Sequence, residues 1–368
     1  MFCMSENQAY LYLEDGTVIE GAGFGARTHR YGELVFSTSM NGYPESMTDP
    51  SYKGQVLIFT HPLIGNYGIP EMISENGILE NFESEGIKTE GIVVSEATSG
   101  RRWNGKLTLD EWLRNEGIPG ISGIDTRELT KRIREGGVLS CVISNAGKMD
   151  DPFTDLSRKY DTNTGLIGSV SIEKAIVYRG RSNKTIALVD LGVKHGILRN
   201  LLKSGYTLAR LPHDCTADEI MSYDPVGVVY SNGPGNPNTM KVESDSLAAV
   251  LEYKLPVLGI CLGHQLSIAA LGGRITKMKY GHRAVNKAVV DMKTGRGYIT
   301  THNHGYACYT QDMPAGIEPW LVSPDDRVVE GIRQEKLLSV QFHPESRPGT
   351  NDTHFIFSEF EKMVRNGT

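Results

Sequence analysis

The chain has 368 residues, of which 39% are hydrophobic and 22% charged, and its formal net charge at pH 7 is −6. This composition is typical of a globular protein, and the length favours two domains over one. The acidic balance provides no overall basic surface for nucleic acid or anionic membrane, and no apolar run reaches the roughly 18 residues that a membrane-spanning helix needs.

The five cysteines are scattered, and no pair has the spacing of a metal or redox motif; they are Cys3, Cys141, Cys215, Cys261 and Cys308. An odd number of unpaired thiols is typical of a reducing compartment. The first eight residues lack the basic segment and apolar core of a signal peptide. We therefore expect a cytoplasmic protein.

Residues 1–145 predict a small mixed α+β domain. Short alternating apolar runs, separated by glycine-containing turns, are typical of strands and occur at 9–13, 18–19, 34–37 and 55–60. One helix is expected to begin after Asp125 or Thr126 and to end at Gly136-Gly137.

A stretch within this domain nearly matches a phosphate-binding loop. Residues 100–106 fit its first seven positions, but Leu107 stands where the loop needs a serine or threonine hydroxyl for magnesium. We therefore expect a surface loop here and no ATP site or other cofactor in this chain.

Residues 146–183 predict a junction, because polar residues and glycines dominate and apolar patches are short. Residues 184–368 then predict an α/β domain with a doubly wound, mostly parallel sheet. Strand-like runs at 186–190, 207–211, 226–230 and 257–260 alternate with helical segments. Such alternation implies a parallel sheet with helices on both faces, and active groups gather at the carboxyl ends of its strands.

One cysteine follows such a strand directly. Cys261 lies between Gly259 and Gly263, after an apolar run and before a helical segment. A strand–turn–helix elbow of this kind exposes one side chain at a helix N-terminus, where the partial positive charge favours the reactive thiolate. An isolated buried cysteine is more often a small core residue, so the interpretation depends on finding a base for the thiol.

A histidine and a glutamate near the C-terminus provide that base. His343 and Glu345 are two residues apart in an extended segment, so their side chains point the same way, and Pro344 keeps the segment extended. His343 would accept the proton of Cys261 while Glu345 orients the ring. The three residues predict a Cys-His-Glu triad for nucleophilic catalysis.

These motifs carry a resemblance. GICLGHQ at 259–265 and QFHPE at 341–345 resemble the class I glutamine amidotransferases, as does the SNGPGNP loop at 231–237. The segments 33–43, 48–52, 64–68 and 123–130 resemble the small-subunit family of the carbamoyl phosphate synthetases. The resemblance extends over nearly the whole chain.

The resemblance implies hydrolysis of L-glutamine and transfer of the ammonia to a large synthetase subunit, which would use bicarbonate, ATP and Mg²⁺ to make carbamoyl phosphate. It implies a glutamine site formed by eight residues: Ser51, Gly233, Gly235, Leu262, Gln265, Asn303, Gly305 and Tyr306. In this site the backbone N–H of Leu262 and the glycine loop would stabilise the oxyanion, because residues without Cβ let the main chain approach closely.

His264, His302 and His304 raise the question of a metal. His302 and His304 share one face of a strand-like run, but a cysteine nucleophile needs no metal, so we expect none. The chain departs from the family at 283–285, where the family commonly has His-Gly-Gly, and at His302, where it often has Gln.

Two alternatives remain open at this point. One is the glutaminase subunit of another amidotransferase, although those families lack the N-terminal motifs. The other is a catalytically silent regulatory subunit of the same fold, which the presence of all three triad residues disfavours.

Overall fold

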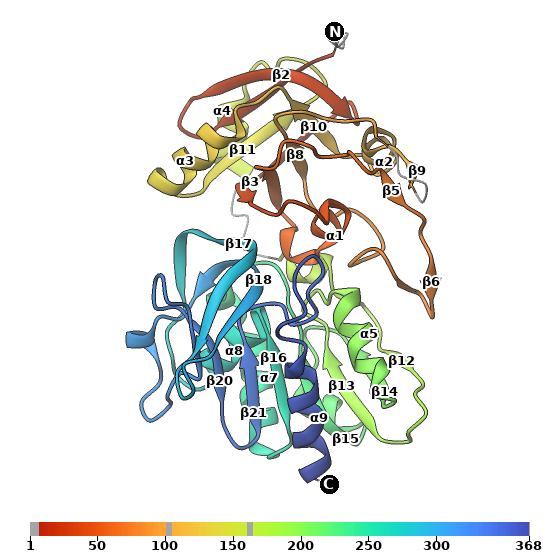
Figure 1. The fold of residues 1–368 in the computed structure, drawn as a ribbon, viewed down its shortest axis with the longest axis vertical. Coiled ribbons are helices and arrows are strands. Elements are labelled where there is room, and N and C mark those ends of the chain that lie inside the picture. Colours follow the sequence, from red (N-terminus) through yellow and green to blue (C-terminus); the bar gives the residue numbers. More distant parts are fainter. Residues whose placement is uncertain (1–6, 101–104, 160–164, 368) are drawn as a thin grey trace. The chain divides into compact units, whose positions relative to one another are not determined.

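The computed structural model describes residues 7–100, 105–159 and 165–367, and the chain divides into two compact units, Met1–Asn163 and Thr164–Thr368 (Figure 1). The finer boundaries at 145/146 and 183/184 stay a prediction. The near-match to a phosphate-binding loop falls partly on 101–104, outside the described residues. None of the described helices is both long enough and apolar enough to cross a membrane.

Seven strands of the first unit close into a barrel in the order β1-β11-β3-β4-β8-β10-β2. They are β1 (Gln8–Leu13), β2 (Val18–Gly25), β3 (His29–Ser37), β4 (Gln55–Phe59), β8 (Gly91–Val93), β10 (Pro119–Ser122) and β11 (Leu139–Ser144). Two short sheets pair β5 (Ile69–Pro70) with β9 (Gly105–Leu107) and β6 (Ser74–Glu75) with β7 (Ile78–Leu79). The strands at 9–13, 34–37 and 55–60 are confirmed to within a few residues.

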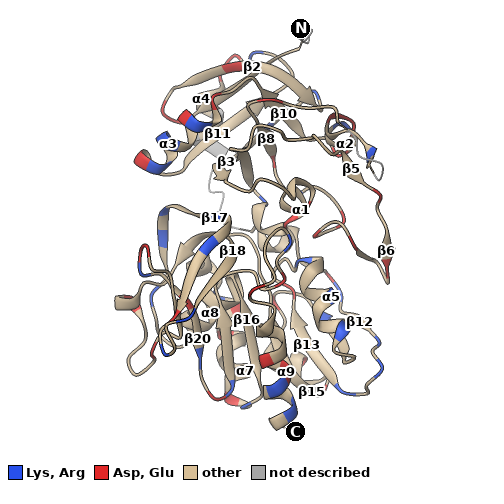
Figure 2. Cartoon of the chain, viewed as in Figure 1, with Lys and Arg blue, Asp and Glu red and all other residues tan. Residues whose placement is uncertain are grey.

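The helices of the first unit are α1 (Tyr43–Thr48), the 3₁₀ turn η1 (Pro50–Tyr52), α2 (Leu109–Asn115), α3 (Thr126–Gly136) and α4 (Pro152–Lys159). Asp125 caps α3 by accepting a hydrogen bond from the Glu128 N–H, and Leu129 and Ile133 are buried. The exposed side of α3 carries charges of both signs (Figure 2). This α and β mixture was predicted, whereas the closure of the barrel was not.

The second unit contains a ten-stranded mixed sheet in the order β12-β14-β13-β15-β16-β21-β20-β19-β17-β18. Its parallel centre consists of β14 (Thr207–Leu211), β13 (Thr185–Val189), β15 (Pro225–Tyr230), β16 (Val257–Ile260) and β21 (Leu337–Val340). Antiparallel strands flank this centre: β12 (Ile176–Tyr178), β17 (Thr276–Asp291), β18 (Gly297–Ala307), β19 (Leu321–Val322) and β20 (Val329–Arg333).

Helices cover both faces of the parallel centre. They are α5 (His195–Lys203), α6 (Ala217–Met221), α7 (Lys241–Glu252), α8 (Leu262–Ala270) and α9 (Phe355–Gly367), with 3₁₀ turns η2 (Ile167–Ser169), η3 (Pro237–Thr239) and η4 (Thr310–Asp312). Val228 and Tyr230 of β15 share a core with α7 and α8, whereas Gly227 faces α9. Alternate side chains of a strand point to opposite faces, so the sheet is buried on both sides, as the α/β prediction required.

Candidate active site

Cys261 lies at the elbow between β16 and α8 and is 2% exposed. Its φ of 53° and ψ of −100° place a non-glycine residue in a rarely populated backbone region. The close packing of strand and helix leaves no room for a side chain at Gly263, because a Cβ there would lie 2.2 Å from the Tyr230 carbonyl oxygen. The sequence therefore builds a constrained turn that presents one thiol at the N-terminus of α8.

His343 and Glu345 follow β21, which pairs in parallel with β16 so that Val340 lies opposite Ile260. The carboxyl ends of the two strands therefore meet at one edge of the sheet, and the residues that follow them become neighbours. The Nδ1 of His343 donates to Oε1 of Glu345 at 2.7 Å. This contact leaves Nε2 as the ring nitrogen available to Cys261.

A buried lysine that was not predicted from the sequence completes this group. The Nζ of Lys194 lies 2.8 Å from Oε1 of Glu345 and donates to the Arg347 carbonyl at 2.7 Å. Lys194 precedes α5 and is 1% exposed. A buried lysine almost always has a charged partner. Because burial is known only from the structure, the sequence alone contains no signal for this residue.

The charges of this cluster set its protonation. Burial acts to raise the pKa of Glu345, but the charges of Lys194 and His343 outweigh it and hold that pKa well below its ordinary value. Burial acts to lower the pKa of His343, but the charges of Glu345 and Cys261 raise it to about 10. The site therefore favours a carboxylate and an imidazolium beside the cysteine.

Two polar groups contact the sulfur of Cys261. The thiol donates to the Asn303 carbonyl at 3.7 Å, and the Nε2 of Gln341 donates to the sulfur at the same distance. Gln341 was not predicted as a site residue. It lies directly after β21, two residues before His343, so the strand that delivers the base also delivers this donor.

The predicted glutamine-binding residues come from several elements. Leu262 is the first residue of α8, so its N–H has no carbonyl one turn earlier in the helix. Gly233 and Gly235 follow β15, and a Cβ at Gly233 would lie 1.9 Å from the Leu191 carbonyl oxygen. Gly235 has a φ of 103°. Both positions therefore require glycine, one for space and the other for its backbone conformation.

Gln265 and the residues of β18 lie beside the cysteine. The Nε2 of Gln265 donates to the Tyr306 carbonyl at 2.7 Å and to Oε1 of Gln341 at 3.0 Å. Asn303 and Gly305 precede Tyr306 on the same strand. Ser51 belongs to the first unit, in η1, where its N–H donates to the capping carboxylate of Asp49. Its role at the glutamine site stays a prediction.

The three histidines considered for a metal separate into two environments. His264 contacts the Ser339 hydroxyl and the Val329 carbonyl, and burial lowers its pKa to about 4. His302 and His304 instead lie with His282 and Glu330 in a second buried cluster. His264 is therefore no member of that cluster.

Comparison with known proteins gives matches over both units. The family described as carbamoyl-phosphate synthase small chain, CPSase domain, matches residues 11–143, and the class-I glutamine amidotransferase family matches residues 187–363. The carbamoyl phosphate synthase small chain of Metallosphaera sedula is 51% identical over 99% of this chain and 98% of its own length. That of Sulfolobus acidocaldarius is 52% identical over 98% of each chain.

A solved structure of a glutamine amidotransferase from Thermotoga maritima also resembles part of the chain. It is 16% identical with a TM-score of 0.37, and the match covers 50% of this chain and 94% of that one.

Proposed function

The chain belongs to the family of carbamoyl phosphate synthase small chains, which carry a class I glutamine amidotransferase domain, and we propose that Cys261, His343 and Glu345 are the groups with which it hydrolyses L-glutamine. Membership of this family implies glutamine as substrate and a large-subunit partner. The match of residues 11–143 favours this family over any other amidotransferase.

The observation that carries the proposal is the 2.7 Å contact between His343 and Glu345 at the strand end beside the Cys261 elbow. The Cys261 thiolate attacks the carboxamide carbon of glutamine and forms a tetrahedral oxyanion. The Leu262 N–H and the main chain at Gly233 are the candidate donors to that oxyanion. The start of α8 fixes the first donor, and the closely packed loop at Gly233 fixes the second. Both therefore need no reorganisation during the reaction.

The proton then moves through His343. The imidazolium gives its proton to the departing nitrogen, so that ammonia leaves and a γ-glutamyl thioester remains on Cys261. His343 next takes a proton from water, which attacks the thioester and releases glutamate. Glu345 and Lys194 together hold the imidazole ring in the orientation that both steps need.

The partner completes the reaction. Class I amidotransferase domains normally need no cofactor, and we assign bicarbonate, ATP and Mg²⁺ to the large subunit, where ammonia would be converted to carbamoyl phosphate. Free ammonia is mostly protonated at neutral pH and then is no nucleophile, so we expect an enclosed passage between the two proteins. We place the complex in the cytoplasm.

The test is Cys261→Ser in the complex with the large subunit. We expect glutamine-dependent formation of carbamoyl phosphate to disappear and ammonia-dependent formation to persist. Equal loss of both would overturn the assignment of Cys261 to ammonia supply.

A labelling experiment addresses the alternative of a catalytically silent protein. A glutamine-like electrophile should modify Cys261 of the native chain and spare the buried thiol of Cys141, which serves as an internal control. Burial raises the pKa of Cys141 well above its ordinary value. Absence of label on Cys261 would favour the silent alternative.

A further inference from the structure

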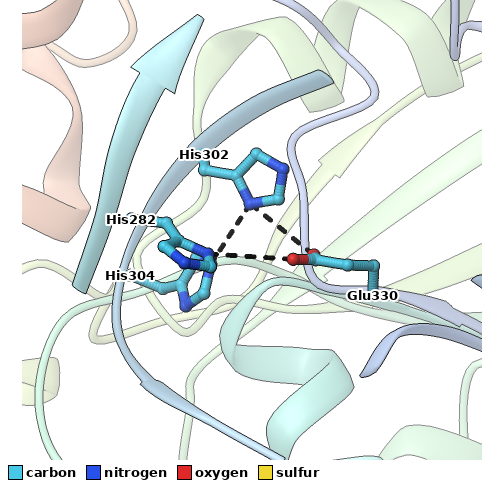
Figure 3. A group of neighbouring side chains, drawn as sticks. All are labelled: His282, His302, His304 and Glu330. Carbon is cyan, nitrogen blue, oxygen red and sulfur yellow. Dashed lines mark hydrogen bonds and ion pairs between the residues drawn. The ribbon is translucent and has the colours of Figure 1, made fainter. Parts of the chain in front are cut away.

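Four buried side chains of the second unit, none of them a triad residue, converge on one another (Figure 3). His282 comes from β17, His302 and His304 from β18, and Glu330 from β20. None is more than 6% exposed, and one nitrogen or oxygen atom of each lies within 4.8 Å of the corresponding atoms of the others. Three strands therefore direct nitrogen and carboxylate groups at one point.

Hydrogen bonds at the outer edge of the cluster determine where two of the histidine protons lie. The Nδ1 of His304 is 2.9 Å from the Tyr306 carbonyl, which only accepts, so Nδ1 carries the proton. The Nε2 of His282 is 2.7 Å from Oδ2 of Asp326. A carboxylate oxygen accepts hydrogen bonds, so Nε2 carries the proton there.

The same reasoning fixes His302. Its Nε2 lies 2.6 Å from the hydroxyl of Thr300, and that hydroxyl donates its own proton to the Lys287 carbonyl at 2.8 Å. The hydroxyl must therefore accept from Nε2, which leaves Nδ1 of His302 unprotonated in the neutral ring.

Three unprotonated nitrogens thus point inward at a carboxylate. The Nδ1 of His302 and the Nε2 of His304 are 3.2 Å apart, and neither has a proton to share with the other. The Nδ1 of His282 and both oxygens of Glu330 have no hydrogen-bond partner among the described residues. A buried acceptor without a donor is costly, and here several share one point.

A proton on Glu330 would satisfy only one of the three nitrogens, whereas a cation satisfies all four groups together. A tetrahedral zinc ion with metal–nitrogen distances of 2.0–2.1 Å holds its ligand atoms about 3.3 Å apart. The His302 and His304 nitrogens are 3.2 Å apart. The Nδ1 of His302 lies 3.6 Å from Oε2 of Glu330, and the Nδ1 of His282 lies 3.8 Å from its other oxygen, Oε1. Small side-chain movements would bring the ligand atoms to zinc-binding distances.

We propose that His282, His302, His304 and Glu330 form a tetrahedral site for a divalent transition metal, with zinc as the ion that fits three imidazoles and one carboxylate. Each imidazole donates its other N–H to a hydroxyl, a carbonyl or a carboxylate, which is the outer support that metal-binding histidines usually have. This inference reverses the expectation from sequence that the chain has no metal site.

Four protein ligands leave no open position, so the metal is structural. It links β17, β18 and β20 at the point where β18 passes the nucleophile, because the Asn303 carbonyl between the two histidines accepts from the Cys261 thiol. The metal therefore stabilises the strand that borders the proposed glutamine site. It takes no part in the chemistry of that site.

Metal content tests this proposal without any measurement of activity, so its outcome is independent of the proposed function. The full chain, expressed without an affinity tag and equilibrated with zinc, should retain about one zinc per chain after gel filtration. Glu330→Gln and His302→Gln should each retain less than about a tenth of that amount. His213→Gln is the matched control, because His213 pairs with Glu243 at 2.7 Å outside the cluster and should not change zinc content.

Cobalt provides a second readout that needs no variant. Co²⁺ bound to the wild-type chain should give the intense visible bands of a tetrahedral site without a thiolate charge-transfer band, since no cysteine belongs to the cluster. A wild-type chain that retains no zinc and gives no tetrahedral cobalt spectrum overturns the proposal. Zinc retained equally by Glu330→Gln, or cobalt bands of thiolate type, also overturns it.

Discussion

Two buried clusters in the second unit each combine a glutamate with histidine, and they differ in where the positive charge comes from. Oε1 of Glu345 has Lys194 at 2.8 Å and His343 at 2.7 Å, so the protein supplies the cation itself. Glu330 has no hydrogen-bond donor among the described residues. The first cluster is complete within the chain, whereas the second requires a proton or an added metal.

The largest expected effect of a single substitution is at Lys194, which supplies the cation of the first cluster. Lys194→Met should leave the Glu345 carboxylate buried and poorly compensated, which costs about 3–5 kcal/mol of unfolding free energy when one partner of a buried pair is removed. Glutamine-dependent activity should fall at least about tenfold because the ring of His343 loses its fixed support. Denaturant unfolding and steady-state kinetics with glutamine and with ammonia measure the two effects.

A double variant serves as the control. Lys194→Met combined with Glu345→Gln removes the unpaired charge, so it should be more stable than Lys194→Met alone while remaining inactive with glutamine. If Lys194→Met unfolds at the wild-type denaturant concentration, the ion pair does not stabilise the first cluster.

The pH dependence of stability should show the same charge compensation with a smaller effect. The pKa of Glu345 is lower in the folded chain than the value of about 4.3 expected when unfolded. Its contribution is therefore present above about pH 4.3 and lost as pH falls through the folded pKa. The stability difference between wild type and Glu345→Gln should shrink as the pH falls below about pH 4, as urea unfolding at each pH would show. A difference unchanged by acid would contradict the assigned ionisation.

The smallest effect concerns the outer support of the second cluster. Thr300→Val removes the hydroxyl that accepts from His302, and loss of such a support typically lowers metal affinity about 10–100-fold. Chelator competition measures that affinity. Thr301→Val is the matched control on the same strand, because its hydroxyl donates to the Pro348 carbonyl at 3.0 Å, and its affinity should remain that of wild type. If both variants lowered the metal affinity equally, Thr300 would not act by fixing the tautomer of His302.

Much of the first cluster was predictable because its signals are local. A strand, a glycine, a cysteine and a helix follow one another directly, and His343 and Glu345 are two residues apart. Alternating strands and helices then imply that the relevant strand ends meet. Lys194 was not predicted because its position in the sequence is typical of an ordinary residue at the start of a helix. Its partner, Glu345, follows β21 and is brought to it only by the fold.

The second cluster could not be predicted because its members meet through non-local pairing. His282 lies opposite His304 across β17 and β18, and that pairing shifts register on both sides of residues 282–284. Glu330 arrives from β20, whose neighbours are β19 and β21. A slip of one residue in any of these registers would turn the side chain to the other face, and the sequence alone does not specify such registers. The same limit hid the barrel of the first unit, whose strand order is not consecutive.

The alternation of β18 has a consequence for how the molecule tolerates change in length. His302 and His304 occupy one face of the strand, and Asn303 and Gly305 alternate with them. Inserting one residue before His302 would exchange the two faces, turning the imidazoles away from Glu330 and the Asn303 amide toward it. Inserting two residues would restore the alternation. Both clusters therefore depend on the alternation of side chains along β18, and an insertion of an odd number of residues would disrupt both together.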